Sequence, residues 1–140
     1  MIKIREFTET DRPELQHIYL RSRQQTFYWL NTALFVLTDF DKDTAGEEIL
    51  VAEDDSILKG FSALWRADNF IHHLYVHPQF LNKGIGKMLL AKVIEKAIKP
   101  ITLKCMANNQ NALAFYKSQG WRYQSEGLNE DGQYYLLVYP

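Results

Sequence analysis

Short runs in which apolar and polar residues alternate, rich in β-branched and aromatic side chains, predict the strands of this protein. The first run places Ile2 and Ile4 between polar neighbours. The later runs predict strands over residues 49–53, 57–65, 70–76 and 101–106, and two last strands on either side of a turn at 131–132.

Helix signals lie between these strands. Residues 11–14 combine a capping aspartate, an early proline and a glutamate three residues on, so we expect a helix that Asp11 caps. A short second helix is predicted over residues 31–37, with Asn31 as its cap. The polar, acidic residues 38–47 predict a loop.

Two further helices complete the pattern. The first opens at a glycine-rich loop, carries Ile85, Met88, Leu89 and Val93 on one face, and is ended by Pro100. The second is predicted over residues 111–118. The resulting order, βαα-βββ-α-β-α-ββ, has no internal repeat and no linker, so residues 1–140 predict one domain.

Composition narrows the class of protein. The chain has 140 residues, 46% hydrophobic and 24% charged, with a formal net charge of −1. This balance is typical of a globular domain and gives no support to a nucleic-acid or membrane partner. The alternating start predicts a strand rather than a signal peptide. Because Cys105 is the single cysteine, no intrachain disulfide is possible, and we expect a cytoplasmic setting.

The clearest chemical signal runs from Val76 to Lys87, where an apolar strand passes through a short loop into a helix that opens with two glycines. A helix start presents unpaired N–H groups and the positive end of the helix dipole, so it favours a phosphate or pyrophosphate. A dinucleotide fingerprint would need a small residue at Leu89, and a P-loop would need serine or threonine at Met88. Both motifs fail.

A third motif matches better. The loop resembles that of the GNAT acyltransferases, in which a strand ending in V-H-P is followed by Q/R-x-x-G-x-G/A. The chain has L-Y-V-H-P at 74–78 and K-G-I-G-K at 83–87. Leu81 and Asn82 depart from the pattern. Because the family binds pyrophosphate mainly through backbone N–H groups, we expect Leu81 to weaken the site without abolishing it.

A second motif follows downstream. Residues 109–121, N-Q-N-A-L-A-F-Y-K-S-Q-G-W, resemble the family segment N-x-x-A-x-x-L/F-Y-x-x-x-G-F. With both motifs in this order, the chain is identified as a member of the GNAT family over nearly its whole length. The resemblance implies the α/β GNAT fold, a mixed and mostly antiparallel sheet that is splayed near its centre and flanked by helices.

The resemblance also implies acetyl-CoA as cosubstrate, with no metal and no protein nucleophile. The backbone of the strand before the loop would pair with pantetheine and hold the developing oxyanion, and the loop would hold the pyrophosphate. Asn109 would either bond the pantetheine amide or cap its helix. The implied cofactor-binding residues are Leu74, Tyr75, Val76, Asn82, Lys83, Gly84, Ile85, Gly86, Lys87, Asn109 and Tyr116.

Two residues are predicted to be catalytic. The Tyr116 phenol, with an ordinary pKa of about 10, could protonate the leaving sulfur; the alternative is a packing residue. By strand alternation, His72 shares a face with Leu74 and Val76, and His73 points to the opposite face. His72 lies where some members carry a catalytic histidine and others a glutamate, so it is a candidate base; a structural role is the alternative.

Other candidates are weaker. Lys104 stands where several N-terminal acetyltransferases of the family carry a glutamate, which disfavours an N-terminal acetyltransferase of the ribosomal-protein type. His77 is interpreted as structural, and Cys105 as a small buried hydrophobe. The acceptor side offers aromatic and acidic side chains that could enclose and attract an amine, or could equally be core and solvated loop: Phe27, Tyr28, Trp29, Phe35, Asp39, Asp41, Asp43, Glu47 and Glu48.

The sequence therefore predicts an N-acetyltransferase that moves an acetyl group from acetyl-CoA to a primary amine, with a small molecule as the leading acceptor. A protein lysine or N-terminus is the second possibility, and a catalytically silent acyl-CoA-binding module is the third. The sequence leaves open the acceptor, the acyl chain length and whether the chain forms a homodimer.

Overall fold

The computed structural model describes residues 1–140, and its elements follow the predicted order. The helices and strands are β1 (Lys3–Glu6), α1 (Arg12–Thr26), α2 (Asp39–Asp43), β2 (Glu48–Asp54), β3 (Ile57–Trp65), β4 (Phe70–Val76), α3 (Ile85–Lys96), β5 (Ile101–Met106), α4 (Gln110–Ser118), β6 (Arg122–Asn129) and β7 (Gly132–Tyr139). Short 3₁₀ turns add Glu9–Asp11, Thr32–Leu34, Arg66–Asp68 and Pro78–Phe80.

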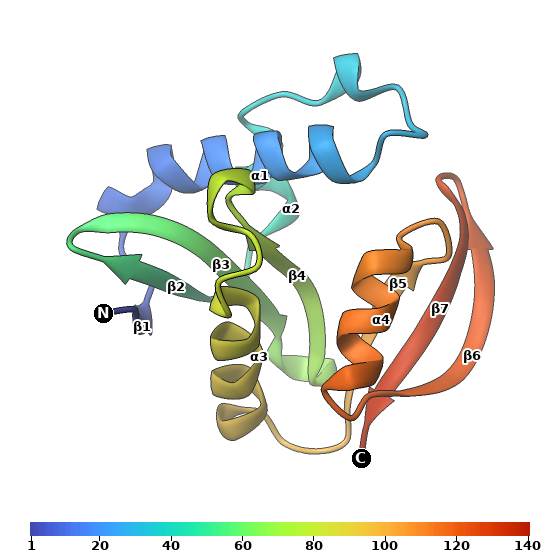
Figure 1. Ribbon diagram of the computed structural model, residues 1–140. Coiled ribbons are helices and arrows are strands. Elements are labelled where there is room, and N and C mark those ends of the chain that lie inside the picture. The colour runs from blue at the N-terminus through green and yellow to red at the C-terminus, as the bar shows by residue number, and fades with distance from the viewer.

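All seven strands form one sheet in the order β1-β2-β3-β4-β5-β7-β6. Every neighbouring pair is antiparallel except β4 and β5. That parallel pair is short: only Phe70 with Thr102 and Ile71 with Leu103 are in register. Beyond Ile71 the strands separate, and Figure 1 shows the two halves of the sheet diverging toward the end where α1 lies. The predicted splay is thus confirmed.

Two apolar cores hold the helices against opposite faces of the sheet. On one face, α3 supplies Ile85, Leu89 and Val93 to a core that also contains residues of β5, and side chains of α4 pack against it. Met88, predicted to lie on the same face of α3, is exposed instead. On the other face, α1 and α2 pack on β2 and β3 through a second core. The members of this second core are Leu15, Ile18, Tyr19, Phe40, Val51, Leu58 and Phe61.

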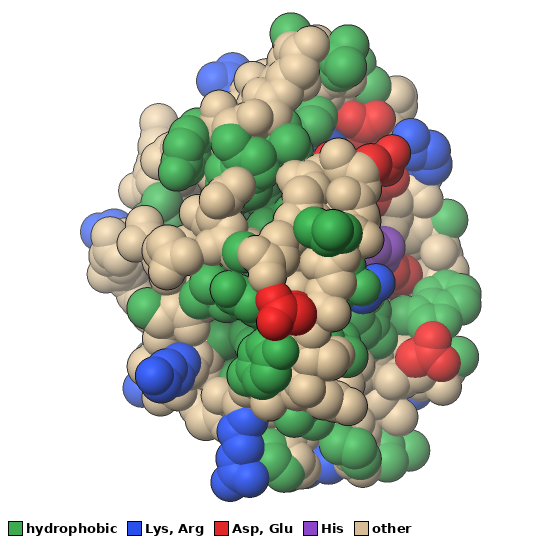
Figure 2. All heavy atoms as spheres, turned by 90° about the vertical axis from the view of Figure 1, so that its right-hand side faces the viewer, with side chains coloured by type: hydrophobic (Ala, Val, Ile, Leu, Met, Phe, Trp, Pro, Cys, Tyr) green, Lys and Arg blue, Asp and Glu red, His purple; other side chains and the backbone are tan.

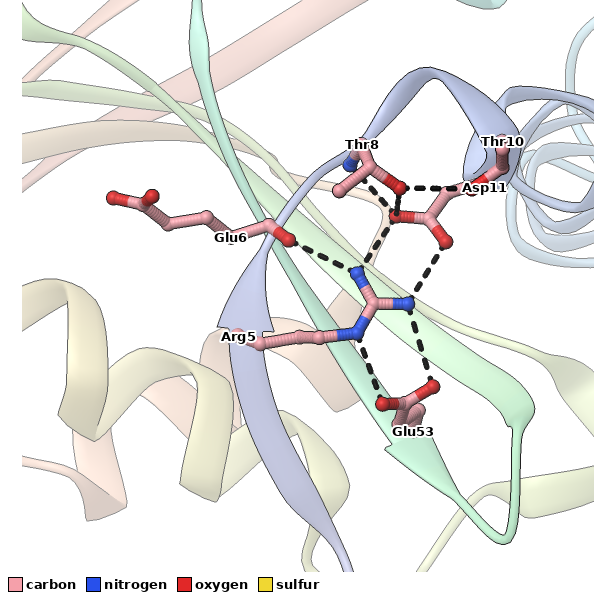
Figure 3. A network of polar contacts seen from close by, with 6 residues as sticks. All are labelled: Arg5, Glu6, Thr8, Thr10, Asp11 and Glu53. Carbon is pink, nitrogen blue, oxygen red and sulfur yellow. Dashed lines mark hydrogen bonds and ion pairs between the residues drawn. The ribbon is translucent and has the colours of Figure 1, made fainter.

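A polar network fixes the start of α1 to the sheet edge (Figure 3). The guanidinium of Arg5 on β1 donates to both carboxylate oxygens of Asp11, at 2.8 and 2.9 Å, and to Glu53 on β2 at 2.9 Å. The Thr8 backbone N–H donates to Asp11 at 2.8 Å. Asp11 is nearly buried, so these charge-assisted bonds replace the water that it loses.

The region before β2 departs from the sequence prediction. Asp11 does not cap α1; its carboxylate instead completes a capping box with Thr8. The predicted helix over 31–37 is reduced to the 3₁₀ turn Thr32–Leu34, and the predicted loop over 38–47 contains α2. Phe40 of α2 is fully buried in the second core, so packing makes a helix of a segment whose sequence is mostly polar. No helix has the length and apolar character needed to cross a membrane.

Candidate active site

The first part of the site is an unpaired edge of β4. The His77 N–H donates to the Lys59 carbonyl at 2.8 Å, which marks a hydrogen-bonded position at the end of the antiparallel ladder with β3. By alternation, the peptide groups of Leu74 and Val76 face away from β3, toward the gap left by β5. Ser22 of α1 donates to the Val76 carbonyl at 3.0 Å. The remaining groups on this edge are free to pair with an extended ligand.

The second part is the helix start that follows. Asn82 and Gly84 both adopt left-handed conformations, with φ of 62° and 79°, so the chain turns sharply into α3. Gly84 is the N-cap and offers no side-chain cap, which leaves the first N–H groups of α3 open to an anion. Lys83 and Lys87 lie exposed on either side. The residues predicted to hold pyrophosphate thus come together at one helix start.

The two glycines of this loop have different surroundings. A Cβ built at Gly84 would meet nothing within 4 Å, so this residue borders open space. A Cβ at Gly86 would lie 3.7 Å from Val76 Cγ2 and 3.7 Å from Phe115 Cζ. Gly86 therefore stands where β4, α3 and α4 approach one another, and the space beside it is narrow.

Tyr116 lies on α4, on the α3 side of the sheet. Burial raises the pKa of its phenol, with smaller contributions from Cys105 and Tyr75. Burial likewise raises the pKa of Tyr75 and raises the pKa of the Cys105 thiol to about 12. The two phenols remain protonated donors, and the thiol is unreactive at neutral pH. The Tyr116 hydroxyl has no hydrogen-bond partner in the protein, so it is free to donate to a ligand.

Asn109 and His77 are both seen in helix-capping roles. The Asn109 side-chain oxygen accepts from the Ala112 N–H at 3.3 Å and caps α4. This bond leaves the amide nitrogen of Asn109 available to a ligand. The His77 ring nitrogen Nδ1 accepts from the Gln79 N–H at 3.1 Å and caps the turn Pro78–Phe80, which supports the structural interpretation of this histidine.

The predicted orientation of His72 is wrong. Ala63 pairs with His73 and Leu64 with Ile71, so His72 is an extra residue in β4. Such a β-bulge places two consecutive side chains toward the same side of the sheet. His73 consequently does not oppose His72: their rings lie 4.1 Å apart, on the α1–α2 face. His72 does not share the face of Leu74 and Val76.

At the bulge, His72 pairs with Glu47, which lies just before β2. Its Nδ1 is 2.5 Å from Glu47 Oε2. Because an ionised carboxylate only accepts, Nδ1 donates to it, and in the neutral form of the ring Nε2 then has the lone pair. The hydrogen bond to Glu47 raises the pKa of His72, against an opposing effect of burial. Burial, together with His72, lowers the pKa of His73 to about 4, so His73 stays neutral.

One family model covers all of these features. The acetyltransferase (GNAT) family model matches residues 5–121, which include the unpaired edge, the helix start and both predicted catalytic residues. The chain belongs to the GNAT acetyltransferase family.

Curated relatives of this GNAT chain include several N-acetyltransferases. An uncharacterized N-acetyltransferase of Archaeoglobus fulgidus is 31% identical over 139 residues, covering 89% of this chain and 87% of the relative. The peptidyl-lysine N-acetyltransferase YiaC of Escherichia coli is 27% identical over 124 residues, covering 84% and 82%. The L-amino acid N-acyltransferase MnaT of E. coli is 37% identical over only 60 residues, so this chain matches 35% of the length of MnaT.

Solved structures confirm the fold. The apo form of YjaB from E. coli has a TM-score of 0.81 at 21% identity and covers 99% of this chain and 97% of that one. The PaiA N-acetyltransferase of Thermoplasma acidophilum, solved in complex with coenzyme A, has a TM-score of 0.78 at 20% identity and covers 99% and 98%. The α/β GNAT fold is therefore established.

The acceptor side of this GNAT domain is less acidic than the sequence implies. Three of the candidate carboxylates are paired with arginines: Asp39 with Arg23 at 3.2 Å, Asp41 with Arg12 at 2.7 Å, and Glu48 with Arg66 at 2.7 Å. The Asp43 carboxylate accepts from the Tyr19 hydroxyl at 2.6 Å, and Glu47 pairs with His72. Phe27 and Tyr28 each contact Trp29 edge-to-face. The Phe35 ring covers the Arg23 guanidinium at 4.4 Å.

Sequence reasoning missed the partnership of Glu47 with His72. Glu47 was only one of several acidic candidates, because its pairing depends on the bulge in β4 and on the path of α2. Its side chain is 3% exposed, which no local pattern indicates. Lys104 of β5 acts on the same histidine, since its charge opposes protonation of His72.

Proposed function

We propose that the protein transfers an acetyl group from acetyl-CoA to the primary amine of a small molecule, by direct attack in a ternary complex. The observation that carries this proposal is the continuity of the unpaired β4 edge with the uncapped start of α3. A donor molecule that combines an amide-bearing arm with a pyrophosphate needs both features in sequence. Acetyl-CoA supplies such an arm, ending in a reactive thioester.

Each part of the donor site has a defined task in this proposal. The Leu74 and Val76 peptide groups pair with the arm, and one of their N–H groups stabilises the negative charge that develops on the thioester oxygen. The segment Asn82–Lys87 binds pyrophosphate through backbone N–H groups, helped by the charges of Lys83 and Lys87. The free amide nitrogen of Asn109 adds a further donor.

The acid and the base act from opposite faces of the sheet. Tyr116 lies on the α3–α4 face and His72 on the α1–α2 face, with the gap between β4 and β5 in the middle. The amine nitrogen forms a bond to the acetyl carbon, and the carbon–sulfur bond breaks. The amine proton passes to His72 Nε2, and the Tyr116 hydroxyl gives its proton to the departing thiolate.

His72 provides the base that a protonated amine needs before it can attack. An alkylamine with a pKa of about 10.4 is mostly protonated at neutral pH, and its deprotonation costs about 4–5 kcal/mol. Glu47 orients His72 and stabilises its protonated form, so that the proton can be accepted. Asp43 and Glu47 attract the cationic amine toward this side of the gap.

A peptidyl lysine is the second candidate acceptor. It is favoured by the similarity to the peptidyl-lysine N-acetyltransferase YiaC, which spans 84% of this chain. The shorter match to an L-amino acid N-acyltransferase favours a small molecule instead. Both acceptors present a primary amine, so the same acid and base serve either one.

The test is thiol release from acetyl-CoA with panels of alkylamines, amino acids, aminoglycosides and lysine peptides, followed by mass spectrometry of the product. We expect release with at least one small amine, together with an acetylated product. Release with lysine peptides alone would replace the first acceptor class by the second. Tight acetyl-CoA binding without release in any panel would identify a silent acyl-CoA-binding module and overturn the proposal.

A further inference from the structure

The β-bulge in β4 brings His73, as well as His72, close to Glu47. Glu47, His72 and His73 place one potential ligand atom each within 4.8 Å of one another. His72 Nδ1 lies 2.5 Å from Glu47 Oε2, and His73 Nε2 lies 3.8 Å from Glu47 Oε1. A general base needs only one histidine, so the second, neighbouring histidine is not explained by acetyl transfer.

Glu47 also carries an unsatisfied atom. Its side chain is 3% exposed, Oε2 contacts His72, and Oε1 is buried with no hydrogen-bond partner. A buried carboxylate oxygen without a hydrogen-bond partner is destabilising, because it has lost its contacts with water. Such an atom in a native protein calls for a specific explanation, and a bound cation is one.

We propose that Glu47, His72 and His73 bind a divalent transition-metal ion of the Zn²⁺ type. Two imidazoles and a carboxylate are a typical three-ligand set for zinc and leave a fourth position open. Calcium and magnesium prefer oxygen ligands throughout, so two nitrogen ligands disfavour them.

The geometry requires only side-chain adjustment. Metal–ligand bonds of about 2.0–2.2 Å in a tetrahedral site separate the ligand atoms by roughly 3.4 Å. The separations of 2.5 Å from His72 Nδ1 to Glu47 Oε2 and of 3.8 Å from His73 Nε2 to Glu47 Oε1 lie on either side of this value. His73 Nε2 also lies 3.2 Å from the Asp43 carbonyl oxygen, and metal binding exchanges that hydrogen bond for a coordinate bond. The half-exposed ring of His72 gives the ion a route from solvent. Figure 2 shows the mixture of acidic, basic and apolar side chains on one face of the molecule, with histidine atoms among them.

A metal ion bound at this site would prevent His72 from acting as the base; this consequence rests on the proposed function. In the neutral imidazole of the metal-free protein, the Nδ1 proton of His72 faces Glu47 and Nε2 has the lone pair. An ion at Nδ1 takes the place of that proton, and neutral imidazole then carries its proton on Nε2. His72 can no longer accept a proton from the amine. The site would therefore act as an inhibitory metal site at the acceptor end of the gap.

The direct test is titration of chelator-treated protein with Co²⁺, followed by visible absorption, with Zn²⁺ then used to displace the Co²⁺. We expect one equivalent of tightly bound ion in the wild type. Glu47→Gln and His72→Ala should each raise the dissociation constant at least tenfold, or about 1.4 kcal/mol. His17→Ala, which removes an exposed histidine of α1 outside the cluster, should bind like the wild type.

Two results would overturn the proposed metal site. These are the absence of Co²⁺ bands in the wild type, and equal affinity in the wild type, Glu47→Gln and His72→Ala. Thermal unfolding of each variant shows whether it is folded; if Glu47→Gln is not, the half-exposed His72→Ala decides.

A thiol-release assay with added Zn²⁺ and then EDTA tests the switch separately. Reversible loss of transfer is expected, and undiminished transfer by the metal-loaded protein would overturn the inhibitory role. Absence of transfer in metal-free protein would count against the proposed function, and the absorption titration would still decide the metal site.

Discussion

Substitution of Gly86 by valine tests the narrow passage between β4, α3 and α4. A Cβ at this position sits 3.7 Å from both Val76 Cγ2 and Phe115 Cζ, which is ordinary van der Waals contact. The Cγ atoms of valine extend about 1.5 Å further, so one that points at either neighbour would approach it to about 2.2 Å. Overpacking of this kind typically costs about 1–3 kcal/mol.

The strain should appear in binding of the donor. Val76 carries the last peptide group of the unpaired edge, and Gly86 lies in the first turn of α3, so displacement of either disturbs both halves of the donor site. We expect Gly86→Val to raise the acetyl-CoA dissociation constant at least tenfold, about 1.4 kcal/mol, in isothermal titration calorimetry. The domain should remain folded by circular dichroism.

Gly86→Ala is the matched control. Its methyl group has room at 3.7 Å, and alanine favours the helix by about 0.5–1 kcal/mol over glycine. The alanine variant should keep a near-native affinity for acetyl-CoA and melt no lower than the wild type. Wild-type affinity in a well-folded Gly86→Val protein, or equal losses in both variants, would refute the reasoning.

Three further predictions follow from the acid, the base and the sheet edge. Tyr116→Phe should lower turnover tenfold or more and leave acetyl-CoA affinity and melting temperature unchanged, because only the proton donor is lost; wild-type turnover would reduce the tyrosine to a packing residue. Glu47 raises the pKa of His72, so Glu47→Gln should lower the maximal rate and move the acidic limb of the pH–rate profile to lower pH when the enzyme is assayed in chelator. An acidic limb that does not move would contradict the assignment of His72 as the base. Arg5 lowers the pKa of Asp11, so Asp11→Asn should cost about 2 kcal/mol of unfolding free energy at neutral pH, and the loss should shrink in acid as the wild-type carboxylate is protonated; a pH-independent loss in urea titrations would argue against the ion pair.

The sheet could be predicted from sequence because its signals are local. The strands Ile57–Trp65, Phe70–Val76 and Ile101–Met106 have the predicted bounds, since alternation and flanking turn residues mark both ends of each. The helix start at Gly84 could be found in the same way, because glycines and the preceding strand fix its geometry.

The acceptor side could not be predicted, since tertiary contacts shape it. Helix α2 is polar in sequence, and it forms where Phe40 enters the second core and Asp41 pairs with Arg12. The bulge at His72 depends on the register between β3 and β4, while periodicity within β4 predicts plain alternation. The orientation of His72, its contact with His73 and its pairing with Glu47 all follow from that single extra residue.

The central claim is that the donor binds along the unpaired edge of β4 and the start of α3. Backbone amide NMR spectra recorded with and without saturating acetyl-CoA test it most directly. The account predicts the largest shifts at Leu74, Val76 and the amides from Gly84 to Lys87, with little change at the exposed Arg21 of α1. Unchanged β4 and α3 amides in the presence of bound acetyl-CoA, with the shifts concentrated elsewhere, would contradict it.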